Sequence, residues 1–242
     1  MLRSYPLGEG DRLVSFLSRE NGKLRGVARG ARSMKSRFGS CLETLSHIRV
    51  WYFERETREL VRINQCELVE SFLDAQRDYR KGVAIALISE ATDFVLQERE
   101  PASPQFRLLL LTARAIQQAD DPWPPLAYFA LWTLKLAGWL PSLDNCGRCG
   151  REFSGEENSH AASQGIFVCV NCKLPGSRVI SPQALASARF SLHNKFAVSG
   201  TSETESLKAR ELFVVLLDWI EFHIEKKLNS RRLLEEGLEQ RN

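Results

Sequence analysis

The stretch Leu13-Val-Ser-Phe-Leu-Ser-Arg-Glu-Asn-Gly-Lys-Leu-Arg-Gly-Val-Ala-Arg-Gly30 contains two short alternating runs on either side of Asn21-Gly22. Asn-Gly between two such runs is the strongest short-range signal for a β-hairpin, because both residues accept the positive φ of a type I′ turn. The sequence therefore predicts two antiparallel strands here, joined through a type I′ turn.

Further strand-like runs follow this hairpin. Residues 45–53 read as one strand, and residues 60–66 as its partner after a polar turn at 54–59. A loop rich in glycine, serine and arginine, residues 30–40, lies between them and the hairpin. Four or five short antiparallel strands in about 70 residues favour a small closed barrel, since closure removes the edges of the sheet.

The pattern changes to helical spacing near residue 74. Apolar residues recur at intervals of three and four over residues 78–99, and Ser103-Pro104 is typical of the start of a second helix. Further helices are predicted at 104–119, at 125–139, from Ser181-Pro182, and from the capping box Ser202-x-x-Glu205 to about Leu228. The prediction is an α+β fold, with a small β-barrel in residues 1–72 and a helical domain in residues 73–242.

Two cysteine pairs, Cys146-Gly-Arg-Cys149 and Cys169-Val-Asn-Cys172, lie 19 residues apart. Two residues between thiolates let a tight turn direct both sulfurs at one ion, and this spacing of pairs is typical of a structural zinc site. Four sulfur ligands complete a tetrahedron and leave no position for a catalytic water. We predict a four-cysteine zinc ribbon or finger in residues 143–175, inserted in the helical domain and holding one structural Zn²⁺. The alternatives are four buried thiols with coincidental spacing and a disulfide pair.

The charge of the chain is concentrated in one segment. The formal net charge is +3, yet residues 19–37 contribute +6 from seven cations against Glu20, so the remaining residues sum to −3. The seven cations are Arg19, Lys23, Arg25, Arg29, Arg32, Lys35 and Arg37. One concentrated basic region on a slightly acidic protein is typical of anion binding. The alternative interpretation is a solvated hairpin and loop.

The candidate phosphate contacts are the last six of these cations. Lys23, Arg25 and Arg29 share one side of the predicted strand, where Arg25 and Arg29 are about 13 Å apart.

The adjacent rings of Trp51, Tyr52 and Phe53 alternate between two faces, so we expect at least one to be exposed enough to stack on a base. Trp51 is our candidate, although alternation alone does not separate it from Tyr52. The candidate nucleic-acid-binding set is therefore Lys23, Arg25, Arg29, Arg32, Lys35, Arg37 and Trp51.

Several classes of protein find little support in the sequence. It has no Gly-x-x-x-x-Gly-Lys-Ser/Thr loop, no Gly-x-Ser-x-Gly elbow and no His-Glu-x-x-His motif, so we predict that the protein is not an enzyme.

His160 is interpreted as an ordinary surface histidine, with a role as substitute zinc ligand as the alternative. The apolar run 126–140 is too short to span a bilayer, which needs about 20 residues. No signal peptide is recognised, and Cys41 and Cys66 read as buried free thiols, so we expect a cytoplasmic protein.

Several blocks of the sequence resemble a known family. They are Pro6-Leu-Gly-Glu-Gly-Asp-Arg-Leu-Val14, Gly22-Lys-Leu-Arg-Gly-Val-Ala-Arg-Gly-Ala-Arg32, Lys35-Ser-Arg-Phe-Gly39, Leu140-Pro-x-Leu-x-x-Cys-x-x-Cys-Gly150, Gly165-Ile-Phe-x-Cys169 and Ser230-Arg-Arg-Leu-Leu234. With these blocks, which cover nearly the whole chain, the sequence resembles the bacterial recombination mediator family RecO, whose members act in DNA repair.

The resemblance implies a fold and a set of partners. It implies an N-terminal OB barrel, a helical domain and a zinc finger inserted in that domain. It also implies binding to single- and double-stranded DNA and annealing of complementary strands. Together with RecR, such a protein helps to load RecA onto strands coated by single-strand DNA-binding protein (SSB), which places it near the bacterial nucleoid. The family usually has several residues before the Leu2-Arg-Ser-Tyr stretch, so we expect a short first barrel strand.

Two other functions are compatible with the residues alone. A zinc-ribbon adaptor of the translation or transcription machinery would use the basic barrel to bind RNA, and competition between matched DNA and RNA separates it from a DNA mediator. A nuclease or other hydrolase would need a cluster of Asp and Glu side chains, which the sequence does not suggest.

Overall fold

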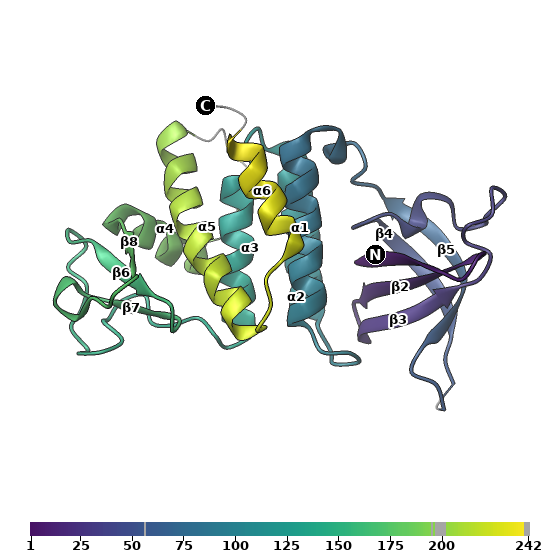
Figure 1. The fold of residues 1–242 in the computed structure, drawn as a ribbon, viewed down its shortest axis with the longest axis horizontal. Helices are drawn as coiled ribbons and strands as arrows, with labels where there is room; N and C mark the ends of the chain where they lie inside the picture. The colour runs from purple at the N-terminus through teal and green to yellow at the C-terminus, as the bar shows by residue number, and fades with distance from the viewer. Residues whose placement is uncertain (56, 195, 197–201, 240–242) are drawn as a thin grey trace. The chain divides into compact units, whose positions relative to one another are not determined.

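The protein is described from a computed structural model, which covers residues 1–55, 57–194, 196 and 202–239 (Figure 1). The chain forms two compact units. The first contains Met1–Gln117 and returns with Leu228–Asn242, and the second contains Gln118–Lys227. None of the helices in the described ranges combines the length and hydropathy that a bilayer crossing requires.

The first unit begins with five strands that form one sheet. They are β1 (Arg3–Leu7), β2 (Asp11–Ser18), β3 (Gly22–Ala28), β4 (His47–Phe53) and β5 (Val61–Glu70), in the order β1-β2-β3-β5-β4. All neighbours are antiparallel except β3 and β5, which are parallel. The strand-rich, OB-like arrangement is as expected, but the expectation of antiparallel strands alone was wrong, because β3 and β5 run in the same direction.

The turn between β2 and β3 differs from the predicted type. Ser18 pairs with Gly22, so three residues connect the strands, and Gly22 has a φ of +65° whereas Asn21 is not among the positive-φ residues. The type I′ prediction is therefore wrong. The Ser18 hydroxyl oxygen accepts from the backbone N–H of Asn21 at 3.2 Å, which favours a three-residue loop followed by a glycine in the left-handed conformation.

Backbone hydrogen bonds connect the residues that come just before the two outer strands, β1 and β4. The Met1 nitrogen donates to the Ser46 carbonyl oxygen at 2.8 Å, and the Leu45 N–H donates to the Met1 carbonyl oxygen at 2.8 Å. The first strand has five residues. Inward side chains fill the barrel, and Cys41 and Cys66 are buried with them, as predicted.

Three helices belong to the same unit as the barrel. They are α1 (Tyr79–Val95), α2 (Ser103–Gln118) and α6 (Asn229–Glu239), and Figure 1 shows α6, in yellow, beside α1. Helix α1 begins where Asp78 accepts from the Lys81 N–H at 3.1 Å. Residue 72, the predicted end of the barrel domain, lies between the strands and the helices. The compact units nevertheless group these three helices with the barrel, so the domain boundary itself stays a prediction.

The second unit packs three helices with the cysteine segment. The helices are α3 (Trp123–Leu136), α4 (Pro182–His193) and α5 (Glu203–His223), and the strands are β6 (Ser159–Ala162), β7 (Ile166–Val168) and β8 (Arg178–Ile180). Helix α3 is buried on most sides, as its apolar sequence predicted, and the capping box of Ser202 and Glu205 starts α5.

The C-terminal helix was predicted as one helix to about Leu228, and this was wrong. Helix α5 ends at His223, Glu225 takes a φ of +52°, and α6 begins at Asn229. A buried carboxylate from α1 explains the restart, because Glu90 accepts hydrogen bonds from the backbone N–H of Asn229 at 3.2 Å and of Ser230 at 2.8 Å. These are the free donors of a new helix N-terminus.

Candidate nucleic-acid interface and cysteine cluster

The four paired cysteines meet in the second unit. Their sulfur atoms all lie within 4.8 Å of one another, and those of Cys149 and Cys169 are 3.8 Å apart. Tetrahedral Zn²⁺ with Zn–S bonds of about 2.3 Å gives sulfur–sulfur edges of about 3.8 Å. The donor set and its dimensions therefore fit a tetrahedral thiophilic metal ion.

Local backbone geometry brings these sulfurs together. Gly150 follows the first pair with a φ of +73°, and its N–H donates to the Cys146 carbonyl oxygen at 2.9 Å. The Gly147 N–H donates to the Phe167 carbonyl oxygen at 2.8 Å, which ties the first turn to β7. The strand β7 then leads directly into Cys169, as predicted for a ribbon.

Backbone donors also favour a thiolate at the centre of the cluster. Burial by itself raises the pKa of Cys146, but backbone N–H groups, including that of Cys169 at 3.4 Å, outweigh it and lower the pKa to about 6. Hydrogen bonds among the sulfurs raise the pKa of Cys172 to about 12. A metal ligand must be a thiolate, so the first sulfur is already in the form that a cation needs.

His160 was interpreted as a surface histidine, and this was wrong. It lies in β6, the central strand between β7 and β8, and is only 5% exposed. Burial, followed by Lys173, lowers the pKa of its imidazole. It is not a member of the four-sulfur group.

The first two candidate cations of the barrel are held by groups on and just after α1. The Lys23 Nζ donates to the Asp93 carbonyl oxygen at 2.5 Å. The Arg25 Nε lies 2.6 Å from a carboxylate oxygen of Glu98, an ion pair without hydrogen-bond alignment. Arg3 of β1 similarly pairs with Glu90 at 3.0 Å. The side chains of Lys23 and Arg25 are thus engaged within the chain.

The other four cations belong to the segment that follows β3, residues 29–37, which we call the basic loop. Arg29, Arg32, Lys35 and Arg37 are all exposed. Arg32 donates to the Gly8 carbonyl oxygen at 2.6 Å, and the Arg37 guanidinium lies 5.1 Å from the centre of the Phe38 ring. In the described part of the chain, the side chains of Arg29 and Lys35 form no ion pair. The structure therefore brings a group of available cations together at one end of β3.

The aromatic residues of β4 alternate as predicted. Trp51 is 44% exposed and Phe53 is 53% exposed, whereas Tyr52 packs against the barrel core beside Phe16. The Tyr52 hydroxyl accepts from the Asn21 side-chain amide at 2.7 Å. Trp51 is therefore available for stacking in a way that Tyr52 is not.

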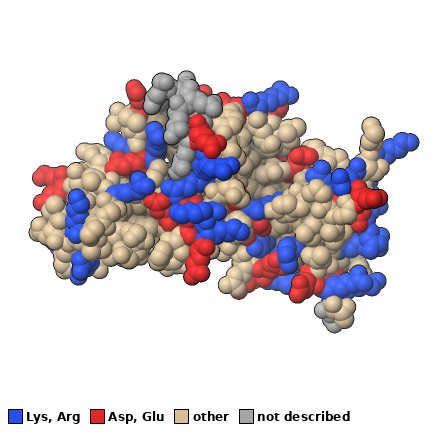
Figure 2. Space-filling view, in the orientation of Figure 1, with Lys and Arg blue, Asp and Glu red and all other residues tan. Residues whose placement is uncertain are grey.

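The face of the barrel in Figure 2 carries many lysine and arginine side chains at its outer edge, on the right of the view, interspersed with acidic ones. One further cation is Arg62 of β5, which is exposed and opposite Phe53 in the strand register. Sequence reasoning missed Arg62, because its isolated charge gave no local signal and only strand pairing places it beside the aromatic residues.

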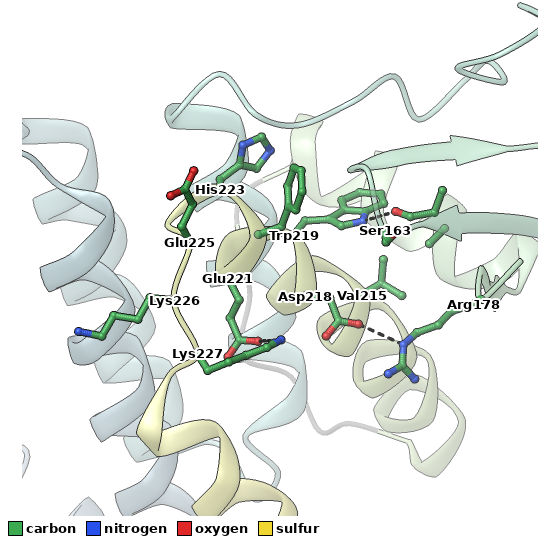
Figure 3. Close-up of a pocket in the computed structure, with 14 residues that line it drawn as sticks. Ser163, Arg178, Val215, Asp218, Trp219, Glu221, His223, Glu225, Lys226 and Lys227 are labelled. Carbon is green, nitrogen blue, oxygen red and sulfur yellow. Dashed lines mark hydrogen bonds and ion pairs between the residues drawn. The ribbon is translucent and has the colours of Figure 1, made fainter. Parts of the chain in front are cut away.

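The second unit has a separate pocket of about 730 Å³ beside the C-terminal half of α5 (Figure 3). Its floor includes Trp219, whose indole N–H donates to the Ala162 carbonyl oxygen at 2.8 Å. Its walls contain ion pairs between Arg178 and Asp218 and between Lys227 and Glu221. Three cationic and three anionic side chains line it, so their formal charges cancel.

Two family models match the chain. Recombination protein O N terminal matches residues 1–72, and Recombination protein O C terminal matches residues 76–232. The chain is 34% identical over 235 residues to the DNA repair protein RecO of Koribacter versatilis, covering 97% of this chain and 96% of the relative. It is 34% identical to that of Streptomyces avermitilis and 35% identical to that of a Nocardioides species, with the same coverage.

Proposed function

The chain belongs to the recombination protein O family and has a role in DNA repair, and we propose that it acts there by binding DNA and annealing complementary strands. The observation that carries the proposal is the basic loop, where exposed cations lie at the end of a barrel strand. Phosphate contacts by Lys and Arg supply most of the sequence-independent affinity for nucleic acid.

The proposed mechanism is electrostatic. The protein captures two strands, or one strand and its coating protein. The exposed cations neutralise the DNA phosphates, so that complementary sequences approach; they are Arg29, Arg32, Lys35 and Arg37. Base pairing then supplies specificity and driving force, and the protein performs no covalent chemistry. We assign Lys23 and Arg25 a smaller part, because their side chains already hold groups of the chain itself.

We also propose that the cysteine cluster binds one Zn²⁺ with a structural role. Four sulfur ligands leave no site for a reacting water, and the segment is too small to hold a core of its own. Structural zinc in small peptides contributes roughly 10–16 kcal/mol of apparent binding free energy, which is ample to order such a segment.

The proposed partners follow from family membership. We propose that the protein works with RecR to help load RecA onto single-stranded DNA coated by SSB, and that it also binds double-stranded DNA. Family membership supports these partners without identifying the residues that contact them.

The decisive experiment measures annealing of two complementary oligonucleotides coated with SSB, with and without RecR. The wild-type protein should accelerate annealing, and Arg29→Glu/Lys35→Glu/Arg37→Glu should lose the effect while keeping its thermal unfolding. Arg77→Glu is the matched control, because Arg77 is exposed and lies outside the basic loop. Unchanged annealing by the triple variant, or equal activity on matched RNA strands, would contradict the proposal.

A further inference from the structure

The face of the barrel that other OB folds use for oligonucleotides is covered in this protein. In OB folds, the face of strands 2 and 3 carries the ligand. Here the Ser15 hydroxyl of β2 donates to the Asp93 carboxylate of α1 at 2.6 Å, and Lys23 of β3 reaches the same helix. The segment after α1 continues this cover, since the Arg99 N–H donates to the Lys23 carbonyl oxygen at 2.9 Å. These contacts occupy part of that face, although the Arg25 side chain on it stays 43% exposed, so another face of the barrel offers a strand of DNA more room.

The outward face of β4 and β5 is available instead. Trp51 and Phe53 point outward from β4, because Val50 and Tyr52 between and beside them pack against the core. In the strand register, Gln65 lies opposite Trp51 and Arg62 lies opposite Phe53, and both of these β5 residues are exposed. This places two exposed rings beside a cation and an amide.

The spacing of the two rings indicates which form of DNA they accept. Alternate residues of a strand are about 6.6 Å apart. Stacked bases of one strand in a duplex are about 3.4 Å apart, half that distance. Neighbouring bases can stack on Trp51 and Phe53 only when the strand is stretched and unpaired, and every base has a π-face that such rings accept.

The charge of this face also fits a nucleic acid. Arg62 forms no ion pair among the described residues, and Arg55 lies over the Phe53 ring at 5.7 Å. Val27 of β3 is the register partner of Arg62 on its other side, and Arg29 follows Val27 by two residues. Arg62 therefore lies between the two exposed rings and β3, the strand that leads to Arg29, the first residue of the basic loop.

We propose that Trp51, Phe53 and Arg62 form a stacking strip that binds unpaired single-stranded DNA. The inference rests on the proposed DNA-binding function and assigns different contacts within it to the basic loop and to the stacking strip. The basic loop contacts the phosphates of any DNA, and the stacking strip recognises the unpaired state by taking up bases. A strand held this way presents the outer edges of its bases to a complementary strand.

The test compares the affinity of full-length protein for a labelled oligo-dT and for a duplex of equal length. Trp51→Ala/Phe53→Ala should weaken binding of the oligo-dT about tenfold or more, with less than about a twofold change for the duplex. Trp51→Phe/Phe53→Tyr should restore single-strand binding, because rings suffice. Phe190→Ala is the matched control, since Phe190 is an exposed ring on α4 of the second unit.

A second measurement follows the fluorescence of Trp51 with the conservative variant Trp51→Phe. The chain has five tryptophans, so the difference in fluorescence between wild type and Trp51→Phe isolates the signal of Trp51. We expect oligo-dT, and not the duplex, to quench that signal. Equal losses on oligo-dT and duplex, or full single-strand affinity in the double alanine variant, would overturn the stacking strip and leave this face to a protein partner. The triple variant of the basic loop, Arg29→Glu/Lys35→Glu/Arg37→Glu, separates failure of the strip from failure of the proposed function. If this variant abolishes DNA binding and the double alanine variant does not, DNA binding stands without the stacking strip. If the wild-type protein binds neither oligo-dT nor the duplex, the proposed function itself fails.

Discussion

The Nε atom of Arg25 on β3 lies 2.6 Å from a carboxylate oxygen of Glu98, three residues beyond the end of α1. Four residues later in the sequence, Arg29 is exposed and forms no ion pair within the described ranges. One basic segment of sequence is therefore divided by the fold into a part that holds the chain together and a part that faces solvent.

This division predicts unequal effects of two matched substitutions. Arg29→Gln should lower DNA affinity about threefold to tenfold, whereas Arg25→Gln should lower it less, because Arg25 is already paired. With four contacting cations on a single strand, the slope of log K against log salt should be about −3, and Arg29→Gln should reduce its magnitude by about 0.7. Fluorescence anisotropy over a series of salt concentrations measures both. A larger loss for Arg25→Gln would show that Arg25 leaves Glu98 to bind DNA.

The buried carboxylate of Glu90 should make stability depend on pH. Burial alone raises the pKa of Glu90, but hydrogen bonds from Ser230 and Asn229, together with Arg3, outweigh it and lower the pKa below its usual range. The carboxylate therefore contributes stability that is complete above its unfolded pKa of about 4.3 and is lost as the pH falls through the folded value.

We expect Glu90→Gln to lower the free energy of unfolding by about 1–3 kcal/mol at neutral pH. The difference from wild type should shrink as the pH falls below about 4.3. Denaturant titrations at several pH values measure it. Glu67→Gln is the control, since Glu67 forms an exposed pair with Arg49, and its effect should stay within about 0.5 kcal/mol. A difference that grew at low pH would contradict the assignment.

The close approach of Gly22 to Glu100 should make this glycine irreplaceable. A Cβ built on Gly22 would lie 1.8 Å from the Glu100 carbonyl oxygen, and its φ of +65° is also unfavourable for other residues. Gly22→Ala should cost about 3 kcal/mol or more, because backbone atoms must move. Gly8→Ala has a similar φ of +59° but open space, and should cost only about 1–2 kcal/mol. Similar unfolding midpoints for the two variants would show that the contact is not tight.

The cysteine cluster should hold one metal ion per chain. Elemental analysis of purified protein should find about one zinc, and Cys169→Ser should lose both the metal and thermal stability. Cys41→Ser should keep the metal, because Cys41 lies in the barrel core. A metal-free preparation that unfolds at the same temperature would refute the structural site.

The six thiols should react in two classes. Burial raises the pKa of Cys66 to about 11, so this thiol is protonated and shielded at pH 8, and Cys41 is buried beside it. A thiol reagent should therefore modify no more than trace amounts in the native metal-loaded protein and about four thiols after a chelator is added. Rapid modification of Cys66 in native protein would show that the barrel opens.

Features with local signals were predictable from the sequence. The strand pair around Asn21-Gly22, the capping box of Ser202 and Glu205, and the cysteine pairs each depend on residues a few positions apart. Backbone preferences and ligand spacing determine such features, and the described structure contains all of them. The turn type was wrong because the Ser18 hydroxyl competes for the backbone donors of the loop.

Features that depend on distant partners were not predictable. Glu98 neutralises Arg25 across 73 positions, and Glu90 starts α6 from 140 positions away. Neither carboxylate has a sequence signal that names its partner. His160 was assigned to the surface without any strand predicted at residues 159–162, and only the place of β6 between two other strands buries it.

The return of α6 to the first unit has a consequence for biosynthesis. Ser230, which Glu90 holds through its hydroxyl at 2.6 Å, is translated 140 residues after that carboxylate. At about 5–20 residues per second, the ribosome needs roughly 7–28 s to cover this interval. During that time the barrel and α1 exist without the last helix, while the intervening unit is being synthesised. We expect the nascent first unit to remain open and exposed to chaperones until α6 has left the ribosome and docks.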